Sequence, residues 1–118
     1  MIALVWQFQV KPESRDDFER LYGANGDWTA IARKSRSYLG SSFLHDMSEA
    51  TRYLLTEYWS EMVVYERHQE DFRDEIASLN ERRDVLLVAS QPLGVFTGLD
   101  VPDRFGPTWS RRRATAGP

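Results

Sequence analysis

Two histidines are the side chains of this 118-residue sequence best suited to accept a proton near neutral pH. An imidazole ordinarily titrates at about pH 6.5, which makes it a natural base wherever a pocket reaches it. His68 falls on the apolar side of a predicted helix, between Tyr65 and Phe72. His45 precedes Asp46, but neighbours on a strand point to opposite faces, so this pair predicts no dyad. For both histidines, a purely structural role is the competing interpretation.

Other familiar kinds of catalytic site find little support in the residues. The chain has no cysteine, which excludes disulfides, thiolate catalysis and cysteine-ligated metals. The two histidines lie far apart and no His-x-x-x-His or Glu-x-x-His spacing occurs, so no metal site is predicted. A Gly-x-Ser-x-Gly nucleophile elbow is missing, and the Gly23 and Gly26 pair lacks the Lys-Ser/Thr ending of a phosphate loop.

Composition and charge indicate one globular domain with an acidic body. Hydrophobic residues make up 42% of the chain and charged residues 28%, with a formal net charge of −3. Residues 101–118 contain four arginines and one acid, so the rest of the chain is acidic and a poor match for nucleic acid. No apolar run approaches the ~18 residues of a membrane span, and the N-terminal segment alternates like a strand, unlike a signal peptide. We therefore expect a cytoplasmic protein without nucleic-acid or membrane partners.

The stretch from Tyr53 to His68 is the element that positions the candidate residues. Its first part, as far as Trp59, is rich in the aromatic, aliphatic and β-branched residues that strands favour. Ser60 offers a side-chain acceptor for a helix start, and Glu61 places a negative charge at that positive end. The apolar residues that then recur at helical spacing are Tyr65, Phe72, Ile76 and Leu79. The pattern predicts a strand that leads directly into one long helix, from about Glu61 to the late eighties.

The chain before this stretch predicts two strands and two helices. Residues 2–10 alternate, with Ile2, Leu4, Trp6, Phe8 and Val10 on one face and Ala3, Val5, Gln7 and Gln9 on the other. Pro12 suits the first turn of a helix that ends near Gly23. Asp27 is predicted to cap a short second helix. Residues 38–47 predict a strand that is thin and strained or bulged around Gly40.

The remaining elements complete one domain over residues 1–100. Residues 48–50 form a short hairpin connection to the third strand, 51–59. Pro92 is predicted to end the long helix, and residues 93–99 form a last short strand. Beyond Pro102 the composition shifts to Pro, Gly, Arg, Ser and Thr, which predicts an extended or disordered tail over residues 101–118.

The order β-α-β-β-α-β predicts an α+β domain of the ferredoxin-like type with an antiparallel sheet. Both long helices then cover one face of the sheet, which accounts for the aromatic face of the first strand. The other face is too apolar to be left in water, with Val5, Phe43 or Leu44, and Leu54 or Leu55 as candidate members. A partner sheet is its simplest cover, so we expect a homodimer through the sheet faces.

The chain resembles the antibiotic biosynthesis monooxygenase-like domains of the dimeric α/β-barrel superfamily. The resemblance rests on VWQFQVKPESRDDFERL at the start, on YLGSSFLHD, and above all on LLTEYWSEMVVYERH, and it covers roughly residues 2–100. In that family a strand that closes on Trp passes into a helix whose first turns carry aromatic residues and often His. Trp59, Tyr65 and His68 match this pattern. Members include cofactor-free oxygenases of polycyclic phenols and quinols, haem-degrading enzymes and proteins of unknown activity.

The residues that mark the haem-degrading branch of that superfamily are absent. That branch uses an Asn on the first strand, a Trp in the second long helix and a His about ten residues further on. Here the first strand has Val5, Trp6 and Gln7, the helical Trp position falls near His68, and Ser78 lies ten residues beyond it. The sequence therefore does not support haem degradation by that route.

The resemblance implies a cofactor-free oxygenase that deprotonates a small aromatic or quinol-type molecule, with a base or polar anchor and aromatic walls. His68 and Tyr58 are the catalytic candidates, and no metal or cofactor is expected. The substrate-binding candidates are Trp28, His45, Trp59, Tyr65, Gln7 and Asn25. As competing interpretations, Trp59 packs the corner between strand and helix, and Gln7 bonds the partner sheet. The alternative for the whole protein is a non-catalytic small-molecule-binding or interaction protein of the same fold.

Overall fold

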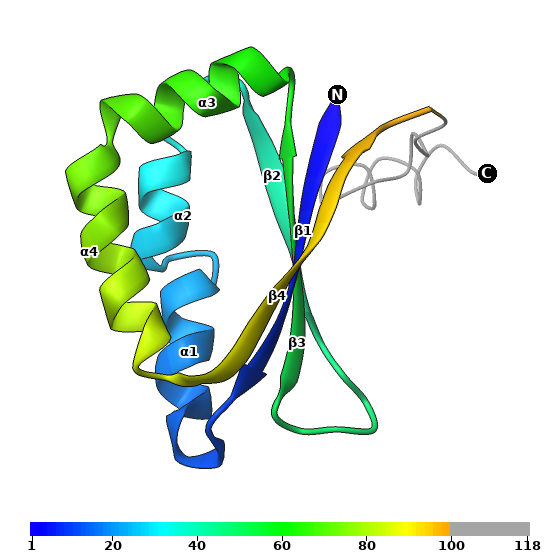
Figure 1. Cartoon of the computed structure of the whole chain (residues 1–118), viewed down its shortest axis with the longest axis vertical. Coiled ribbons are helices and arrows are strands. Elements are labelled where there is room, and N and C mark those ends of the chain that lie inside the picture. Colours follow the sequence, from blue (N-terminus) through cyan, green and yellow to red (C-terminus); the bar gives the residue numbers. More distant parts are fainter. Residues whose placement is uncertain (100–118) are drawn as a thin grey trace, which may run out of the picture.

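The strands form one antiparallel sheet in the order β2-β3-β1-β4, in a computed structural model that describes residues 1–99. The strands are β1 (Ile2–Val10), β2 (Tyr38–His45), β3 (Arg52–Trp59) and β4 (Leu87–Thr97). A short 3-10 helix, η1 (Pro12–Ser14), precedes the α-helices α1 (Arg15–Tyr22), α2 (Asp27–Ala32), α3 (Met62–Asp71) and α4 (Arg73–Asp84). The helices lie on one side of the sheet (Figure 1). The predicted ferredoxin-like β-α-β-β-α-β fold, with an extra short helix in the first crossover, is confirmed.

The two central strands present one buried row to the helices. In β1, the residues Leu4, Phe8 and Val10 are buried, as the period-two pattern predicted. The buried residues of β3 are Tyr53, Leu55, Glu57 and Trp59. The register places β1 directly against β3, with Leu4 opposite Glu57. Any cavity between the sheet and the helices is therefore lined by these alternate residues.

Aromatic packing fixes the first helix on the sheet. Phe18 of α1 is fully buried, and its ring centre lies 5.3 Å from that of Phe8 and 5.0 Å from that of Tyr53. Burial of a side chain of this size contributes about 1.5–3 kcal/mol. Tyr22, one turn further along α1, lies 5.1 Å from Trp28 of α2. Aromatic contacts thus continue from the sheet through α1 to the short helix α2.

The single long helix predicted after Glu61 is wrong, because the chain bends at Phe72. Its backbone there, with φ −114° and ψ 30°, leaves the helical range and separates α3 from α4. Figure 1 shows α3 crossing one end of the sheet while α4 runs along it. A straight helix could not cover both, and the bend places Gln69 of α3 and Ile76 of α4 over the same part of the sheet.

The last strand is longer than predicted. It begins at Leu87, so Pro92 lies inside β4 instead of ending a helix. A proline is tolerated there because β4 is an edge strand that pairs only with β1 among the described strands. The pairing shifts register next to this position, between Val5 and Trp6 of β1.

Two predicted helix caps and one strand end are also wrong. The N-cap of α3 is Glu61, because the backbone N–H of Ser60 is still bonded to the carbonyl of Ser37 at 2.9 Å. Asp27 is the first residue of α2, and its carboxylate pairs with Arg82 at 2.9 Å. The second strand ends at His45. Beyond it, the Asp46 side chain accepts the backbone N–H groups of Ser48 and Glu49 and starts the hairpin turn. The predicted irregularity at Gly40 is confirmed by φ +120° and a register shift.

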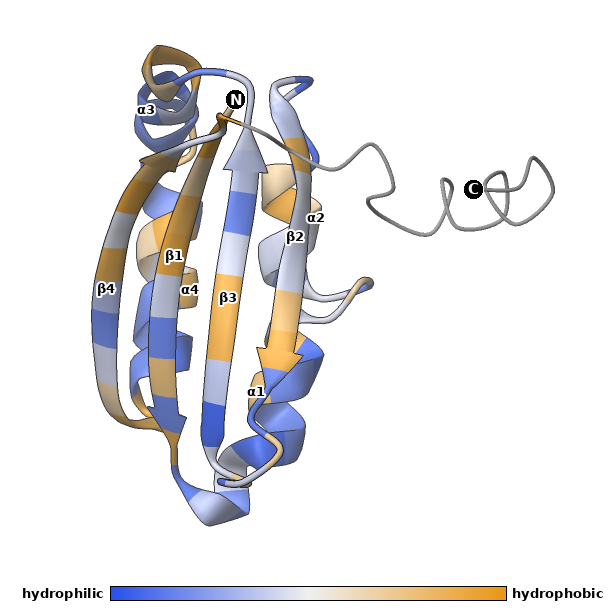
Figure 2. Ribbon diagram, turned by 90° about the vertical axis from the view of Figure 1, so that its right-hand side faces the viewer, coloured by the Kyte–Doolittle hydropathy of each residue, from blue (hydrophilic) through white to orange (hydrophobic). Residues whose placement is uncertain are grey.

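Among residues 1–99, no helix covers the second face of the sheet (Figure 1). The register assigns Val5, Leu44 and Leu54 to this face, whereas Phe43 and Leu55 face the helices. Figure 2 views the sheet from this side, with the helices behind it, and all its strands carry hydrophobic segments. The predicted tail, 101–118, lies outside the described residues. No helix in the described part is long and apolar enough to cross a membrane.

Gly26→Ala should destabilise the protein. Gly26 is buried in the turn between α1 and α2, and a Cβ there would collide with the backbone carbonyl oxygens of Arg20 and Leu21. Relief requires a shift of α1 or α2, so we expect a loss of about 3 kcal/mol in the free energy of unfolding, measured with urea. Asn25→Ala, at the exposed preceding position, should change it by less than about 0.5 kcal/mol. Equal stability of the two variants would contradict this packing.

Candidate functional site

Two neighbouring cavities, together called the hollow, lie between the sheet and the helical layer. The larger part of the hollow, the chamber, has a volume of about 230 Å³. The chamber is lined by Trp6, Phe8 and Leu55 of the sheet, Tyr22 of α1, Trp28 of α2, Tyr65 and Gln69 of α3, and Ile76, Asn80 and Arg83 of α4. Its smaller part, the recess, has a volume of about 20 Å³ and shares Trp28, Tyr65, Gln69 and Ile76 with the chamber. The recess adds Glu57, Trp59 and His68, with Ile31, Ala32 and Leu79.

The chamber has a mixed lining of aromatic and polar side chains. Five of its side chains are aromatic, and an engineered cavity of about 150 Å³ is enough to hold benzene. Larger grooves of about 420 and 570 Å³ lie on the outer side of the helices, but no sheet residue lines them and charged side chains border them. The chamber is smaller than these grooves, yet it combines aromatic walls with a few polar groups, as ligand sites do.

Arg83 brings a permanent positive charge to the chamber. Its side chain is 17% exposed, and its guanidinium carbon lies 5.6 Å from the ring centres of both Phe8 and Trp28. Its Nη1 donates to the Tyr22 hydroxyl at 3.4 Å, and Asp84 accepts from Nε and Nη2. Burial raises the pKa of Tyr22, and the neighbouring Arg83 counteracts this rise. A developing oxyanion in the chamber would find its cation here.

Glu57 is a buried acid at the recess. It is 4% exposed and accepts two indole N–H groups, from Trp28 at Oε2 (2.8 Å) and from Trp59 at Oε1 (3.0 Å). Burial raises the pKa of Glu57, while the hydrogen bonds from Trp59 and Trp28 and the nearby His68 counteract the rise. The carboxyl group thus links α2 to β3.

His68 lines the recess with one nitrogen committed to the backbone. Its Nε2 lies 2.9 Å from the carbonyl oxygen of Ile31, which can only accept, so Nε2 is assigned the proton in the neutral ring. Nδ1 then carries the lone pair and receives the Gln69 amide N–H at 3.4 Å. The rings of Trp59 and Phe72 flank the imidazole at 4.9 Å each. Because Gln69 lines both parts of the hollow, the lone pair of Nδ1 lies one side chain away from the chamber.

The hollow brings together four of the predicted site residues: Trp28, Trp59, Tyr65 and His68. Trp59 is fully buried and packs the corner of strand and helix, with Tyr65 edge-on to it at 5.3 Å. Burial raises the pKa of Tyr65 to about 12, so its hydroxyl stays neutral near pH 7. Trp59 is thus a packing residue at this corner, as the competing interpretation states. It also lines the recess.

The other predicted site residues lie elsewhere. Tyr58 faces the opposite side of the sheet from Trp59, with its hydroxyl 3.3 Å from that of Ser42. Asn25 lines a groove on the outside of the helices. His45 lies at the hairpin end of β2, stacked on Tyr53 at 4.6 Å, with Nε2 bonded to the Ala50 carbonyl. None of these three lines the chamber or the recess.

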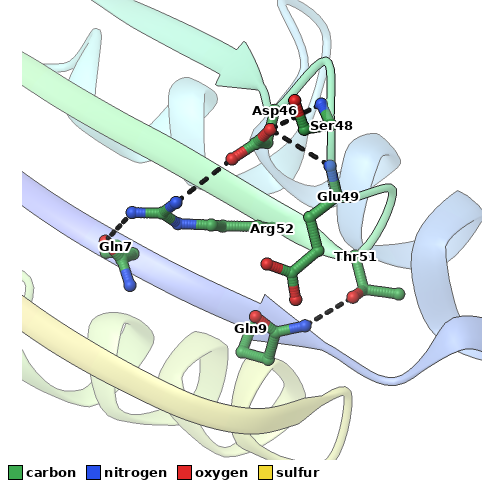
Figure 3. Close-up of polar contacts among 7 residues, drawn as sticks. All are labelled: Gln7, Gln9, Asp46, Ser48, Glu49, Thr51 and Arg52. Atoms are coloured by element: carbon green, nitrogen blue, oxygen red, sulfur yellow. Dashed lines mark hydrogen bonds and ion pairs between the residues drawn. The ribbon is translucent and has the colours of Figure 1, made fainter.

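Gln7 belongs to a polar network on the face without helices. Its side-chain oxygen accepts Arg52 Nη2 at 2.8 Å, and Arg52 Nη1 pairs with Asp46 at 3.2 Å (Figure 3). On the same face, Gln9 donates separately to the hydroxyl of Thr51 (Figure 3). The amide of Gln7 thus has partners within its own sheet and does not point into the hollow.

The sequence analysis missed Glu57, Arg83, Tyr22 and Asn80 at the site. For Glu57 a signal was present, because it stands between Leu55 and Trp59 in the period-two row that faces the core. An acid in such a row is rarely left without partners. Arg83 carries no comparable signal, since its place at the chamber depends on the bend at Phe72. Within residues 1–99, no three acidic or histidine side chains are placed to hold a metal ion together.

Comparisons with known proteins agree with the fold described above. A family model described as Antibiotic biosynthesis monooxygenase matches residues 1–71, from β1 through α3. A mutant form of SnoaB, a cofactor-independent oxygenase from Streptomyces nogalater, has a TM-score of 0.73 at 15% identity, over 86% of this chain and 96% of its own.

Two further solved structures are similar. Putative antibiotic biosynthesis monooxygenases from Caulobacter crescentus and Nitrosomonas europaea have TM-scores of 0.70 and 0.68, at 16% and 14% identity. They cover 84% and 85% of this chain, and 90% and 100% of their own chains. At these identities the likeness establishes the fold alone. A comparison with curated proteins finds no match for the chain.

The buried carboxyl group predicts how stability depends on pH. Because the pKa of Glu57 is raised on folding, the folded state holds this proton more tightly than the unfolded chain. The resulting stabilisation is fully present below the ordinary Glu pKa of 4.5 and is lost as pH rises through the folded pKa. Urea unfolding should therefore show the wild type losing stability relative to Glu57→Gln as pH rises above about 4.5.

A matched variant isolates this effect from the other carboxyl groups. Glu61→Gln removes an exposed acid nearby and should leave the pH dependence of unfolding parallel to that of the wild type. The free energies of unfolding of the wild type and Glu57→Gln are then compared at each pH. A difference that does not change with pH, or that shifts in favour of the wild type as pH rises, would contradict a raised pKa for Glu57.

Proposed function

The chain belongs to the antibiotic biosynthesis monooxygenase family, and from that premise we propose that it oxygenates a small aromatic or quinol-type substrate without a cofactor. The observation that carries this proposal is the hollow itself, where aromatic walls enclose a buried histidine at one part and an arginine at the other. The similarity in fold to SnoaB, a cofactor-independent oxygenase, supports it. Fold alone does not confer the activity, so the argument rests on the side chains.

His68 is the proposed proton acceptor. Its Nδ1 lone pair is occupied only by a long contact of 3.4 Å from the Gln69 amide, which a substrate hydroxyl or acidic C–H group can replace. The Ile31 carbonyl would hold the imidazolium through Nε2–H once the proton is taken. Tyr58, the second predicted catalytic residue, has no role in this hollow because it faces the opposite side of the sheet.

Arg83 is the proposed partner of the negative charge that deprotonation creates. Arg83 lines the chamber and His68 lines the recess, so proton removal and charge stabilisation fall to different residues. In an anthrone-type ring system, removal of a proton from the ring CH₂ group moves negative charge onto the oxygen across the ring. A fixed guanidinium near that oxygen stabilises the anion that reacts with oxygen.

The reaction balances without any further oxidant or reductant. One CH₂ group and one O₂ give one C=O group and one water. The base takes the first C–H proton, and the electron pair left behind forms the new C–O bond to O₂. The base then returns that proton to the peroxide, and loss of the second C–H proton with cleavage of the O–O bond releases water. The chamber volume of about 230 Å³ favours a substrate that places one or two of its fused rings in the chamber.

A second candidate function is favoured by one specific observation. Both nitrogens of His68 and both oxygens of Glu57 already have partners within the protein. Side chains that are fully satisfied need no substrate to explain them. A non-catalytic small-molecule-binding protein of the same fold would keep the aromatic chamber and use these groups only to hold it in shape.

We propose in addition that two chains pair through the sheet faces that carry no helices. Leu44 and Phe96 are each 53% exposed, and the register places Phe96 beside Ala3 on this face, together with Val5 and Leu54. Large apolar side chains in such numbers are characteristic of an interface. A second copy offers the same surface and so supplies a self-complementary cover.

Oxygen uptake by metal-stripped protein tests the proposed reaction. With a panel of anthrones, naphthols and hydroquinones, uptake should saturate and survive a chelator. His68→Gln keeps an N–H for the Ile31 carbonyl but removes the base, so kcat/KM should fall by about 10²- to 10⁴-fold. Arg83→Gln should also lower kcat, because the anion loses its cation.

The control for this experiment is His45→Gln, which alters the histidine at the hairpin and should leave kinetics unchanged. Uptake that is lost in His45→Gln and retained in His68→Gln would move the site to the hairpin. Saturable naphthol binding without oxygen uptake would favour the binding-protein function.

Light scattering tests the pairing of sheets. The wild type should have twice the chain mass of 13.7 kDa, and Leu54→Arg, which places a charge on the face without helices, should be monomeric. Val63→Arg, on an exposed position of α3, should remain a dimer. A strictly monomeric wild type at micromolar concentration would refute this interface.

A further inference from the structure

Glu57 is a buried acid that the proposed reaction does not use directly. It is 4% exposed and lies in the middle of the sheet, opposite Leu4 of β1 and Ser41 of β2. Its carboxyl oxygens accept the indole N–H groups of Trp28 and Trp59, one on each oxygen. Trp59 is fully buried in the core, so the carboxyl group is anchored on that side.

The two contacts are best served by a carboxylate. Each oxygen of an ionised carboxyl group is an acceptor, so one group serves two donors at once. A glutamine in the same place would offer one oxygen, and its amide N–H₂ would face the other indole N–H. A leucine would satisfy neither indole, and both N–H groups would stay buried without partners. The pattern of donors thus selects glutamate at position 57.

The carboxylate satisfies the two indole N–H groups at a cost to stability. It loses its hydration on burial, and two neutral donors offset that loss only in part. Leu55, two residues earlier on this row, fills the core without such a cost, but a leucine at position 57 would leave both indoles without a partner. What distinguishes Glu57 is the side chain that it holds in place, the indole of Trp28.

Trp28 stands where the chamber meets the recess. It lines both, with its ring 5.1 Å from Tyr22 and 5.6 Å from the guanidinium carbon of Arg83. It belongs to α2, a helix of only six residues, so its own helix gives it little support. Because its N–H is bonded to Glu57, Trp28 can offer the chamber only its ring and no hydrogen-bond donor.

We propose that Glu57 is a positioning residue, which fixes the Trp28 indole and thereby sets the wall on which a flat aromatic substrate stacks. This inference rests on the proposed function. It assigns Glu57 no contact with the substrate, since Trp28 provides that contact. It also implies a substrate preference. A ring that stacks on Trp28 should carry polar groups that can bond to Arg83, Asn80 or Gln69, which are the polar residues of the chamber.

The test combines 1-naphthol binding with NMR of the indole N–H groups. In the intact protein labelled with ¹⁵N-tryptophan, Glu57→Gln should shift the Trp28 and Trp59 indole resonances, assigned with Trp→Phe variants. It should also weaken 1-naphthol binding, measured by calorimetry, by about tenfold, because the loss of a hydrogen bond to a charged group corresponds to that factor. Trp28→Phe, which keeps a ring but removes its N–H, should weaken binding to a similar degree.

The double variant shows whether Glu57 acts through Trp28. Once the indole N–H is gone, adding Glu57→Gln should change naphthol affinity by less than about twofold. A tenfold effect in both backgrounds, or wild-type affinity in Trp28→Phe, would overturn the inference, and the latter result does not depend on whether Glu57→Gln folds. Naphthol binding that is unaffected by either single variant would overturn it while leaving the proposed function intact. If the wild type binds no naphthol although both indole resonances shift, the proposed function fails and Glu57 is structural only.

Discussion

The alternation of β3 is the constraint on which the rest of the structure depends. From Tyr53 to Trp59, every second side chain is turned toward the helices and buried. Trp59 closes this row at the point where the chain leaves the sheet for α3, and its complete burial fixes the direction in which the helical layer starts. A shift of one residue would turn Glu57 and Trp59 to the face without helices and bring Tyr58 into the core.

That constraint explains why the polar groups of the hollow are divided between its two parts. Glu57 reaches the recess from the sheet, and His68 reaches it from the first turns of α3, directly after the corner. Arg83 arrives from α4 only because the helix bends at Phe72, and it lines the chamber instead. An acid, an imidazole and a guanidinium are thereby fixed around aromatic walls by three different elements. Of these three groups, the guanidinium is the one whose positive charge would stabilise a substrate anion in the proposed reaction.

The sequence predicted those parts of this arrangement that follow from local pattern. The alternation in β1, the strand at β3, the corner after Trp59 and the short helix bearing Trp28 each depend on neighbouring residues, and each is confirmed. The bend at Phe72, the continuation of β4 through Pro92 and the approach of Arg83 depend on how distant elements pack, and no period in the sequence encodes them. The hollow lies on the side of Trp59, so Tyr58, a predicted catalytic residue, faces away from it. Glu57 does not stand out among the aromatic, aliphatic and β-branched residues that mark this strand, and its burial follows only from the row that faces the helices.

The proposed function requires that the hollow between sheet and helices, and not the opposite face, receives an aromatic ligand. Methyl NMR of the intact protein during titration with 1-naphthol tests this most directly. Leu55 and Ile76 line the chamber, whereas Val5 and Leu54 lie on the face of the sheet without helices. The account predicts that the methyl resonances of Leu55 and Ile76 move with saturable dependence on ligand while those of Val5 and Leu54 stay in place. Saturable shifts confined to Val5 and Leu54 would contradict it.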